Sequence, residues 1–292
     1  MLLVSVLLTA VGIAGAQVPA SGVPMERLVL FDPHAAKQWS QAESSAETST
    51  TRTRSSAPTL HWHVTVDHTT GEPKYPIGWP RITQTIPDGP LRDWSAWDFL
   101  HFWVFTETSR ERLPRDPVGL TLYAPDKSSG FLRRLSELKK RTWTEVTVPI
   151  AQISRPADVR LIQFHISESD YRHQDTLDLY FDELALLRYA KPTLLDFAAE
   201  RAVMFDDTKH IPAHFRLSGV KPDEMLEVSC ELRREGRIAA RASVKATRGL
   251  QRALLDVSRT RLTPGEYELV ATVAGGPPPT AAKVRLVESP WR

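Results

Sequence analysis

Apolar and polar residues alternate along most of this chain with a period of two. Side chains of a β-strand point alternately to opposite faces, so this alternation predicts strands with one buried face. Turn-forming phrases such as Pro-Asp-Gly and Ala-Pro-Asp separate the apolar runs. In the first half, strands are predicted at residues 28–31, 60–66, 81–86, 100–105, 118–123, 143–148, 161–166 and 177–187.

Two segments of the first half do not follow this alternation. Residues 40–58 are rich in Ser, Thr, Glu and Arg, which predicts a long loop or a poorly ordered edge segment. Residues 131–140 are short and charged, and they are the plausible helix of this half.

The second half shows the same alternation. Strands are predicted at residues 211–217, 225–232, 238–244, 252–257 and 267–273, a spacing typical of a β-sandwich. Strands and helices do not alternate, which disfavours a parallel α/β sheet. A chain of 292 residues exceeds the usual size of one domain. The sequence therefore predicts an all-β chain of two sandwiches that meet near Pro192.

Charge and composition narrow the choice of partner. The formal net charge is +2, and the 37 Lys and Arg residues are scattered along the chain. Nucleic-acid binding would instead require a basic stripe, so no nucleic-acid partner is expected. The single cysteine, Cys230, cannot form an internal disulfide. Alternation along its strand points it to the same face as Leu226, Val228 and Leu232. We expect it to be a small buried hydrophobe.

The first 16 residues carry no charge and end in Ala14-Gly15-Ala16, which is typical of a signal peptide and its cleavage site. The usual positive residues at the start are missing. The run is short for a membrane span, and no other long apolar stretch follows. A secreted, periplasmic or cell-surface location is expected, without a membrane span.

Three phrases carry a family resemblance in the first half. They are the aromatic run at 93–105, the Trp-x-x-Val-x-Val-Pro phrase at 143–149 and the closing Leu-Tyr-Phe-Asp-Glu-Leu phrase at 179–184. Together, over residues 26–190, they resemble the galactose-binding-like jelly rolls of many carbohydrate-binding modules. Residues 195–288, with the turn phrase at 262–270, resemble immunoglobulin-like and fibronectin-like sandwiches.

The first resemblance implies a structural Ca²⁺ between the first and last strands of the jelly roll. The matching acidic positions are Asp32 and Asp182, with Glu43 or Glu183 as further ligands, because Ca²⁺ takes six to eight oxygens. The alternative is that Asp32 and Asp182 are solvated strand ends.

The same alternation predicts which side chains face a ligand. Leu60, Trp62 and Val64 should face the core, which leaves His61 and His63 outward. In jelly-roll order the four strands concerned should share one sheet, so their outward residues would form one surface. That surface comprises His61, His63, His101, Trp103, Gln163, His165 and Tyr180. Aromatic rings with directional polar groups suit a polysaccharide or other glycan.

Several other interpretations remain open. Trp79, in a proline-stiffened loop, is a second candidate for glycan contact, whereas Trp94, Trp97 and Trp143 are expected to fill the core at strand starts. The His-rich face would be buried if the second sandwich packed on it, as in a structural or protein-binding protein. A cupin-like metal site would combine His61 and His63 with His101 or His165. A jelly-roll polysaccharide lyase or hydrolase would use His165, Tyr123 or Tyr180.

No paired catalytic carboxylates and no catalytic sequence motif stand out. The sequence therefore predicts a binding protein rather than an enzyme. It would be an exported, non-catalytic, polysaccharide-binding protein or accessory module that works with a separate glycan-degrading enzyme.

Overall fold

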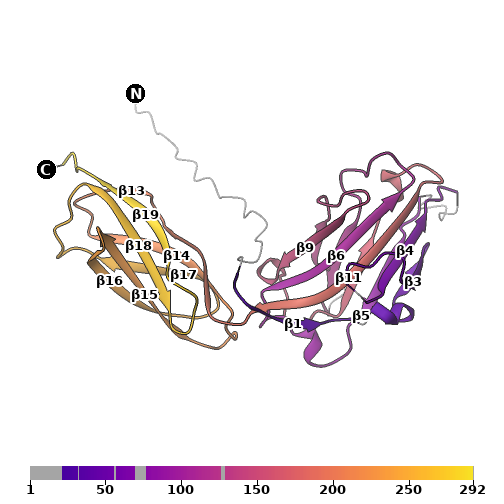
Figure 1. Cartoon of the computed structure of the whole chain (residues 1–292), viewed down its shortest axis with the longest axis horizontal. Helices are drawn as coiled ribbons and strands as arrows, with labels where there is room; N and C mark the ends of the chain where they lie inside the picture. Colours follow the sequence, from indigo (N-terminus) through magenta and orange to yellow (C-terminus); the bar gives the residue numbers. More distant parts are fainter. Residues whose placement is uncertain (1–21, 32, 56, 70–76, 126–128, 292) are drawn as a thin grey trace.

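The computed structural model describes residues 22–31, 33–55, 57–69, 77–125 and 129–291. These residues form β-strands and a few short 3-10 helices, so the chain is all-β, as predicted (Figure 1). The predicted signal peptide, residues 1–16, lies outside the described residues. No helix within the described ranges has the length and apolar character needed to cross a membrane.

The first half is a sandwich of two antiparallel sheets. Sheet A has the order β3 (Ser45–Ser49), β4 (Thr59–Thr65), β11 (Thr176–Tyr189), β6 (Phe99–Thr108) and β9 (Trp143–Pro149), and β1 (Met25–Val29) also pairs with β11. Sheet B has the order β2 (Ser40–Ala42), β5 (Arg81–Thr85), β10 (Leu161–His165), β7 (Gly119–Tyr123) and β8 (Ser129–Arg134). The connecting 3-10 helices are η1 (Pro33–Gln38), η2 (Pro90–Arg92), η3 (Ile150–Gln152) and η4 (Glu168–Asp170).

The core between sheets A and B is built from the apolar positions of the alternating strands. Phe164 of β10 packs on Phe181 of β11 with ring centroids 4.4 Å apart, and on Phe102 of β6 at 5.4 Å. Trp62 and Val64 are completely buried. The inward set predicted from parity is thus confirmed, because one buried face per strand fixes which residues point inward.

Both irregular segments contain strands. The predicted helix at 131–140 is wrong, because residues 129–134 form β8, the edge strand of sheet B, paired with β7. Pairing with a neighbouring strand outweighs the helix propensity of a short charged run. Residues 40–58 were predicted to be a long loop or an edge segment. They contain β2 and β3, which are edge strands of sheets B and A, so the second of these two predictions describes them better.

The second half is a smaller sandwich with its own core. Sheet C has the order β12 (Thr193–Ala199), β14 (His210–Ser218) and β17 (Gly249–Asp256). Sheet D has the order β13 (Val203–Phe205), β19 (Thr280–Val287), β18 (Gly265–Val273), β15 (Leu226–Arg234) and β16 (Arg237–Ala246), with β13 parallel to β19. Cys230 is buried in this core, as predicted, and burial raises the pKa of its thiol to about 11.

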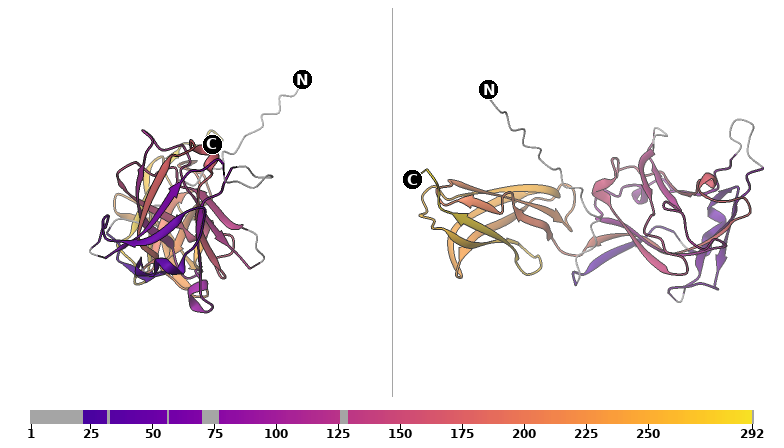
Figure 2. Two further views of the ribbon diagram at one scale, coloured as in Figure 1. Left: turned by 90° about the vertical axis from the view of Figure 1, so that its right-hand side faces the viewer. Right: turned by 90° about the horizontal axis from the view of Figure 1, so that it is seen from above.

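The two sandwiches lie end to end (Figures 1 and 2). At the junction, Arg248 of the second sandwich forms an ion pair with buried Asp98 of the first and donates to the carbonyl oxygen of Trp97. The other carboxylate oxygen of Asp98 accepts from the N–H groups of Tyr189 and Gly219, at 3.0 and 3.3 Å. The second sandwich therefore contacts an end of the first and does not cover the outer face of sheet A, contrary to the structural alternative.

Candidate functional site

The predicted ligand residues do not share one surface. β4, β6 and β11 belong to sheet A, but β10 lies in sheet B between β5 and β7. Gln163 and His165 therefore lie on the opposite side of the sandwich from His61 and Tyr180. Parity predicts which side chains leave the core, but it cannot tell to which of two sheets a strand belongs.

Four rings form a continuous row across the outer face of sheet A. The β-ladder places His61 opposite Tyr180, Tyr180 opposite Phe105, and Phe105 opposite Trp143. Consecutive ring centroids are 4.4, 6.1 and 5.6 Å apart. All four side chains are partly exposed, and we call this set the aromatic row. Trp143 is not in the core, contrary to expectation, and it ends the row on edge strand β9.

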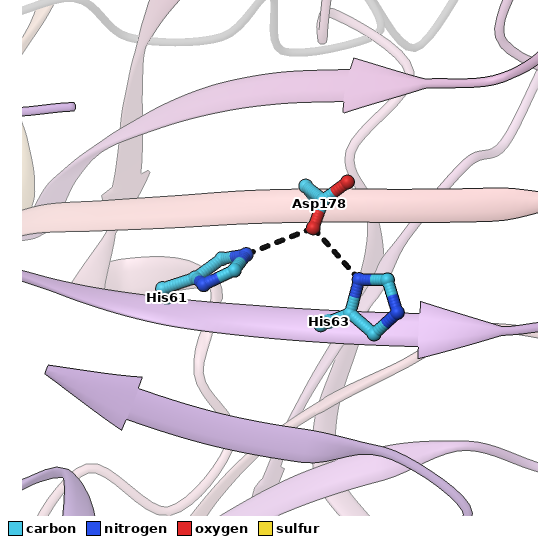
Figure 3. A group of neighbouring side chains, drawn as sticks. All are labelled: His61, His63 and Asp178. Carbon is cyan, nitrogen blue, oxygen red and sulfur yellow. Dashed lines mark hydrogen bonds and ion pairs between the residues drawn. The ribbon is translucent and has the colours of Figure 1, made fainter. Parts of the chain in front are cut away.

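A polar cluster lies beside the aromatic row, where β4 and β11 pair (Figure 3). One oxygen of Asp178, Oδ1, lies 2.9 Å from Nε2 of His61 and 2.7 Å from Nδ1 of His63. The second ring nitrogen of His61, Nδ1, lies 3.1 Å from Oε1 of Glu47 on β3. The second ring nitrogen of His63, Nε2, lies 3.2 Å from Oγ1 of Thr65.

These contacts shift the titration of the polar cluster. Partial burial acts to lower the pKa of His61, but hydrogen bonds to Asp178 and Glu47 outweigh it and raise the pKa above its usual value. The hydrogen bond from His61 holds the pKa of Asp178 below its usual value, against partial burial. The cluster thus favours positive charge on the imidazole and negative charge on the carboxylate.

Two other predicted ligand residues of sheet A contact charged neighbours. The guanidinium of Arg54 lies over the ring of Trp103, 3.7 Å from its centroid. His101 is buried, and its Nε2 lies 2.9 Å from Oε1 of Glu145. His101 is therefore closed to a ligand, whereas Trp103 is partly exposed, like the rings of the aromatic row, and has Arg54 over its ring.

The surroundings of Asp182 do not fit a calcium ion. Its side chain is buried, so it is not a solvated strand end, and Oδ2 accepts from the N–H groups of Arg54 and Ser55 at 3.3 and 3.1 Å. The hydroxyl of Ser55 also donates to Oδ2, at 3.1 Å. Ca²⁺ requires oxygen ligands at this position, whereas the carboxylate faces hydrogen-bond donors. The other predicted ligand, Asp32, lies outside the described residues.

Sheet B holds the remaining predicted residues. The indole N–H of Trp79 donates to Nδ1 of His165 at 3.1 Å, so the neutral ring carries its proton on Nε2, 3.2 Å from Oγ1 of Thr121. The ring lies over Gly119, where a Cβ atom would collide with it. Burial lowers the pKa of His165 to about 4, which keeps it neutral. Gln163 is also buried and bonds Thr83.

The division between two sheets separates residues that two of the sequence-based interpretations combined. His165 and Tyr180 lie on opposite sheets and cannot act on one substrate as a lyase pair, whereas Tyr123, the other predicted lyase residue, lies on sheet B, where its hydroxyl accepts from the Nε2 group of Gln163 at 3.4 Å. Neither His101 nor His165 joins His61 and His63, so the predicted cupin-like histidine set does not form. The residue that does join them, Asp178, was missed, although it shares the parity of Tyr180 two positions later.

The described cavities lie elsewhere. One of about 270 Å³ lies between the two sandwiches and is lined by Trp97, Asp98 and Arg248 among others. Another of about 650 Å³ lies on the second sandwich, beside Met204, Phe205 and other residues. The aromatic row is part of neither cavity. Its four side chains are partly exposed on the outer face of a sheet, whereas sites for small ligands are usually concave.

No protein-family model and no curated protein matches this chain. Among solved structures, it is similar to a β-1,2-glucanase from Parabacteroides distasonis, with 11% identity, a TM-score of 0.39, and coverage of 86% of this chain and 37% of that one. It is also similar to the glycoside hydrolase domain of Endo-D from Streptococcus pneumoniae (10% identity, TM-score 0.30, coverage 85% and 37%). A β-glucuronidase from Ruminococcus gnavus gives 11% identity, a TM-score of 0.25, and coverage of 92% and 46%.

The chain spans about a quarter to a half of the length of such neighbours. Each of these neighbours is described as a glycoside hydrolase or is named for such an activity. The prediction that the chain is not an enzyme does not agree with these neighbours and is not retained.

Proposed function

We propose that this chain is a carbohydrate-active protein and that the outer face of sheet A binds a polysaccharide. The aromatic row carries the proposal. It aligns His61, Tyr180, Phe105 and Trp143 across four neighbouring strands, at spacings between 4.4 and 6.1 Å. Rings combine a large apolar contact area with a rigid shape, which suits the C–H faces of sugar rings. A carbohydrate substrate is also what the glycoside hydrolases named above have in common.

Polar side chains flank the aromatic row and supply directional contacts. Glu107, next to Asp178 across the β6–β11 ladder, forms ion pairs with Arg141 and Arg52 at 3.1 and 3.7 Å. Arg52 also lies over the ring of Phe105, 5.4 Å from its centroid. Carboxylates accept hydrogen bonds from sugar hydroxyls, and guanidinium groups donate to them, so both kinds of partner lie beside the rings.

In this proposal the first sandwich acts as a carbohydrate-binding module. The second sandwich, proposed to be immunoglobulin-like, acts as a spacer joined through Asp98 and Arg248. In this proposal the protein acts outside the cytoplasm, in keeping with the apolar composition and the Ala14-Gly15-Ala16 cleavage site of residues 1–16. A glycan-degrading activity accompanies the binding face, in this protein or in a partner.

A panel of soluble polysaccharides, including β-glucans and uronic-acid polymers, tests the proposal. The full chain is run through native gels that contain each polysaccharide, and the same incubations are assayed for released reducing ends. Retardation in at least one gel is expected. Folded protein that migrates unretarded through every gel would contradict the proposal. Release of reducing ends would show that this chain itself cleaves the bound glycan.

A further inference from the structure

The ring of His61 has carboxylate oxygens on both sides. Nδ1 lies 3.1 Å from Glu47, and Nε2 lies 2.9 Å from Asp178. A neutral imidazole carries one N–H group, so one of these two contacts would join a lone pair to a carboxylate oxygen. Glu47 can accept the N–H of Nδ1, which leaves the lone pair of Nε2 directed toward Asp178 and free to bind a metal ion.

The gap toward Asp178 is shared with His63. Nε2 of His61, Nδ1 of His63 and a carboxylate oxygen of Asp178 all lie within 4.8 Å of one another. Among the residues that the structure describes, no other three His, Cys, Asp or Glu side chains converge in this way. Neighbouring ligands of a tetrahedral Zn²⁺ ion lie about 3.3 Å apart. The two nitrogen–oxygen distances to Oδ1 of Asp178 are 2.9 Å from His61 and 2.7 Å from His63. Each needs to lengthen by only about half an ångström to match this spacing.

The surroundings of the polar cluster resemble those of a bound metal. Ligating histidines usually pass their other N–H to a carboxylate or another oxygen, which fixes the ring orientation. Glu47 does this for His61, and Thr65 is placed to do it for His63. Tyr180 stacks on His61 and holds the ring in place. The side chain of His63 is 39% exposed, so an ion can enter from solvent and keep open positions for water.

We propose that His61, His63 and Asp178 form a binding site for a divalent transition-metal ion, with Zn²⁺ as the reference ion. Two imidazole nitrogens and one carboxylate oxygen are a ligand set that Zn²⁺ favours, and solvent completes the coordination (Figure 3). The site lies at the His61 end of the aromatic row, but its ligands bind the ion without any glycan. Zn²⁺ binding can therefore be tested separately from polysaccharide binding, and the failure of one does not imply the failure of the other.

Isothermal titration of Zn²⁺ into the metal-stripped full chain, without a polyhistidine tag and at neutral pH, tests this site. One ion per chain is expected. His63→Gln and Asp178→Asn each remove a ligand and should weaken binding at least ten-fold. Glu47→Gln leaves the ligands in place but removes the partner of His61, and it should weaken binding by about 10-fold or more.

His173→Gln is the matched control. His173 is 43% exposed and lies 3.7 Å from Asp67 and close to His68, but these three do not converge on one point. Unchanged affinity is expected for this variant. Absence of Zn²⁺ binding by the wild-type chain would overturn the proposal. So would equal affinity in the His63→Gln and Asp178→Asn variants, provided that circular dichroism shows both to be folded, or loss of binding in His173→Gln.

Discussion

The imidazole of His61 lies flat against the phenol ring of Tyr180, with centroids 4.4 Å apart and planes inclined by 4°. The two residues face each other across the β4–β11 ladder. Tyr180 also contacts Phe105 on its other neighbouring strand, so it connects the two halves of the aromatic row.

Tyr180→Ala should therefore weaken polysaccharide binding about ten-fold or more, because it divides the aromatic row and releases the His61 ring. A ten-fold change corresponds to about 1.4 kcal/mol, close to the range for one aromatic pair. Tyr180→Phe keeps the ring and should bind like wild type. Affinity gels with a polysaccharide that retards the wild-type chain provide the measurement. Equal binding by Tyr180→Ala and Tyr180→Phe would exclude the ring from the site.

The ion pair between Asp98 and Arg248 should hold the two sandwiches in a fixed arrangement. Arg248→Met leaves the carboxylate of Asp98 buried without its charged partner, which costs about 3–5 kcal/mol. We expect a lower melting temperature and a broader distance distribution in small-angle X-ray scattering. Arg252→Met breaks an exposed ion pair with Glu200 and serves as the control, with no measurable change expected. An unchanged scattering profile for Arg248→Met would show that other contacts fix the junction.

His165 should make the protein less stable in mild acid. Its folded-state pKa of about 4 lies below the usual value of 6.5, so the unfolded chain binds the proton more readily. The free energy of unfolding is therefore highest above the unfolded-state pKa, and it falls as the pH drops toward 4. Between about pH 7 and about pH 4.5 we expect a loss of about 2–3 kcal/mol from this residue. Urea unfolding at both pH values should show a smaller loss in His165→Gln than in wild type.

Asp182 should stabilise the fold by anchoring residues 54 and 55, not by binding calcium. Asp182→Ala removes the acceptor for two N–H groups and the Ser55 hydroxyl, which costs about 2 kcal/mol. Asp158→Ala, in an exposed ion pair with Arg160, should leave the unfolding free energy unchanged. Added calcium should not raise the melting temperature of the metal-stripped wild-type chain. A clear increase with calcium would contradict this role.

The all-β class and the inward residues were predictable because alternation reports directly on burial. Phe102, Phe164 and Phe181 lie in the core for this reason. The pairing of β10 with β5 and β7 was not predictable in this way, since strand order depends on contacts between distant segments. The predicted surface of seven residues was consequently divided between two sheets.

The composition of the site was harder to predict than the fold. Trp143 and Phe105 joined His61 and Tyr180 only through the register of three ladders, which a single sequence does not reveal. Trp103 has outward parity, as predicted, but the guanidinium of Arg54, from the connection between β3 and β4, lies over its ring. Parity indicates the direction of a side chain, but not what lies above it.

Trp143 gives the most direct test of polysaccharide binding by the outer face of sheet A. Trp143→Ala is compared with Trp79→Ala in gels that contain a retarding polysaccharide. Trp79 is the matched control, because it is a 42%-exposed tryptophan that bonds His165 of sheet B. The account predicts that Trp143→Ala binds the polysaccharide at least ten-fold more weakly than the wild-type chain. Trp79→Ala should be retarded like the wild-type chain. Full retardation of Trp143→Ala together with loss in Trp79→Ala would place the glycan on sheet B and contradict the account.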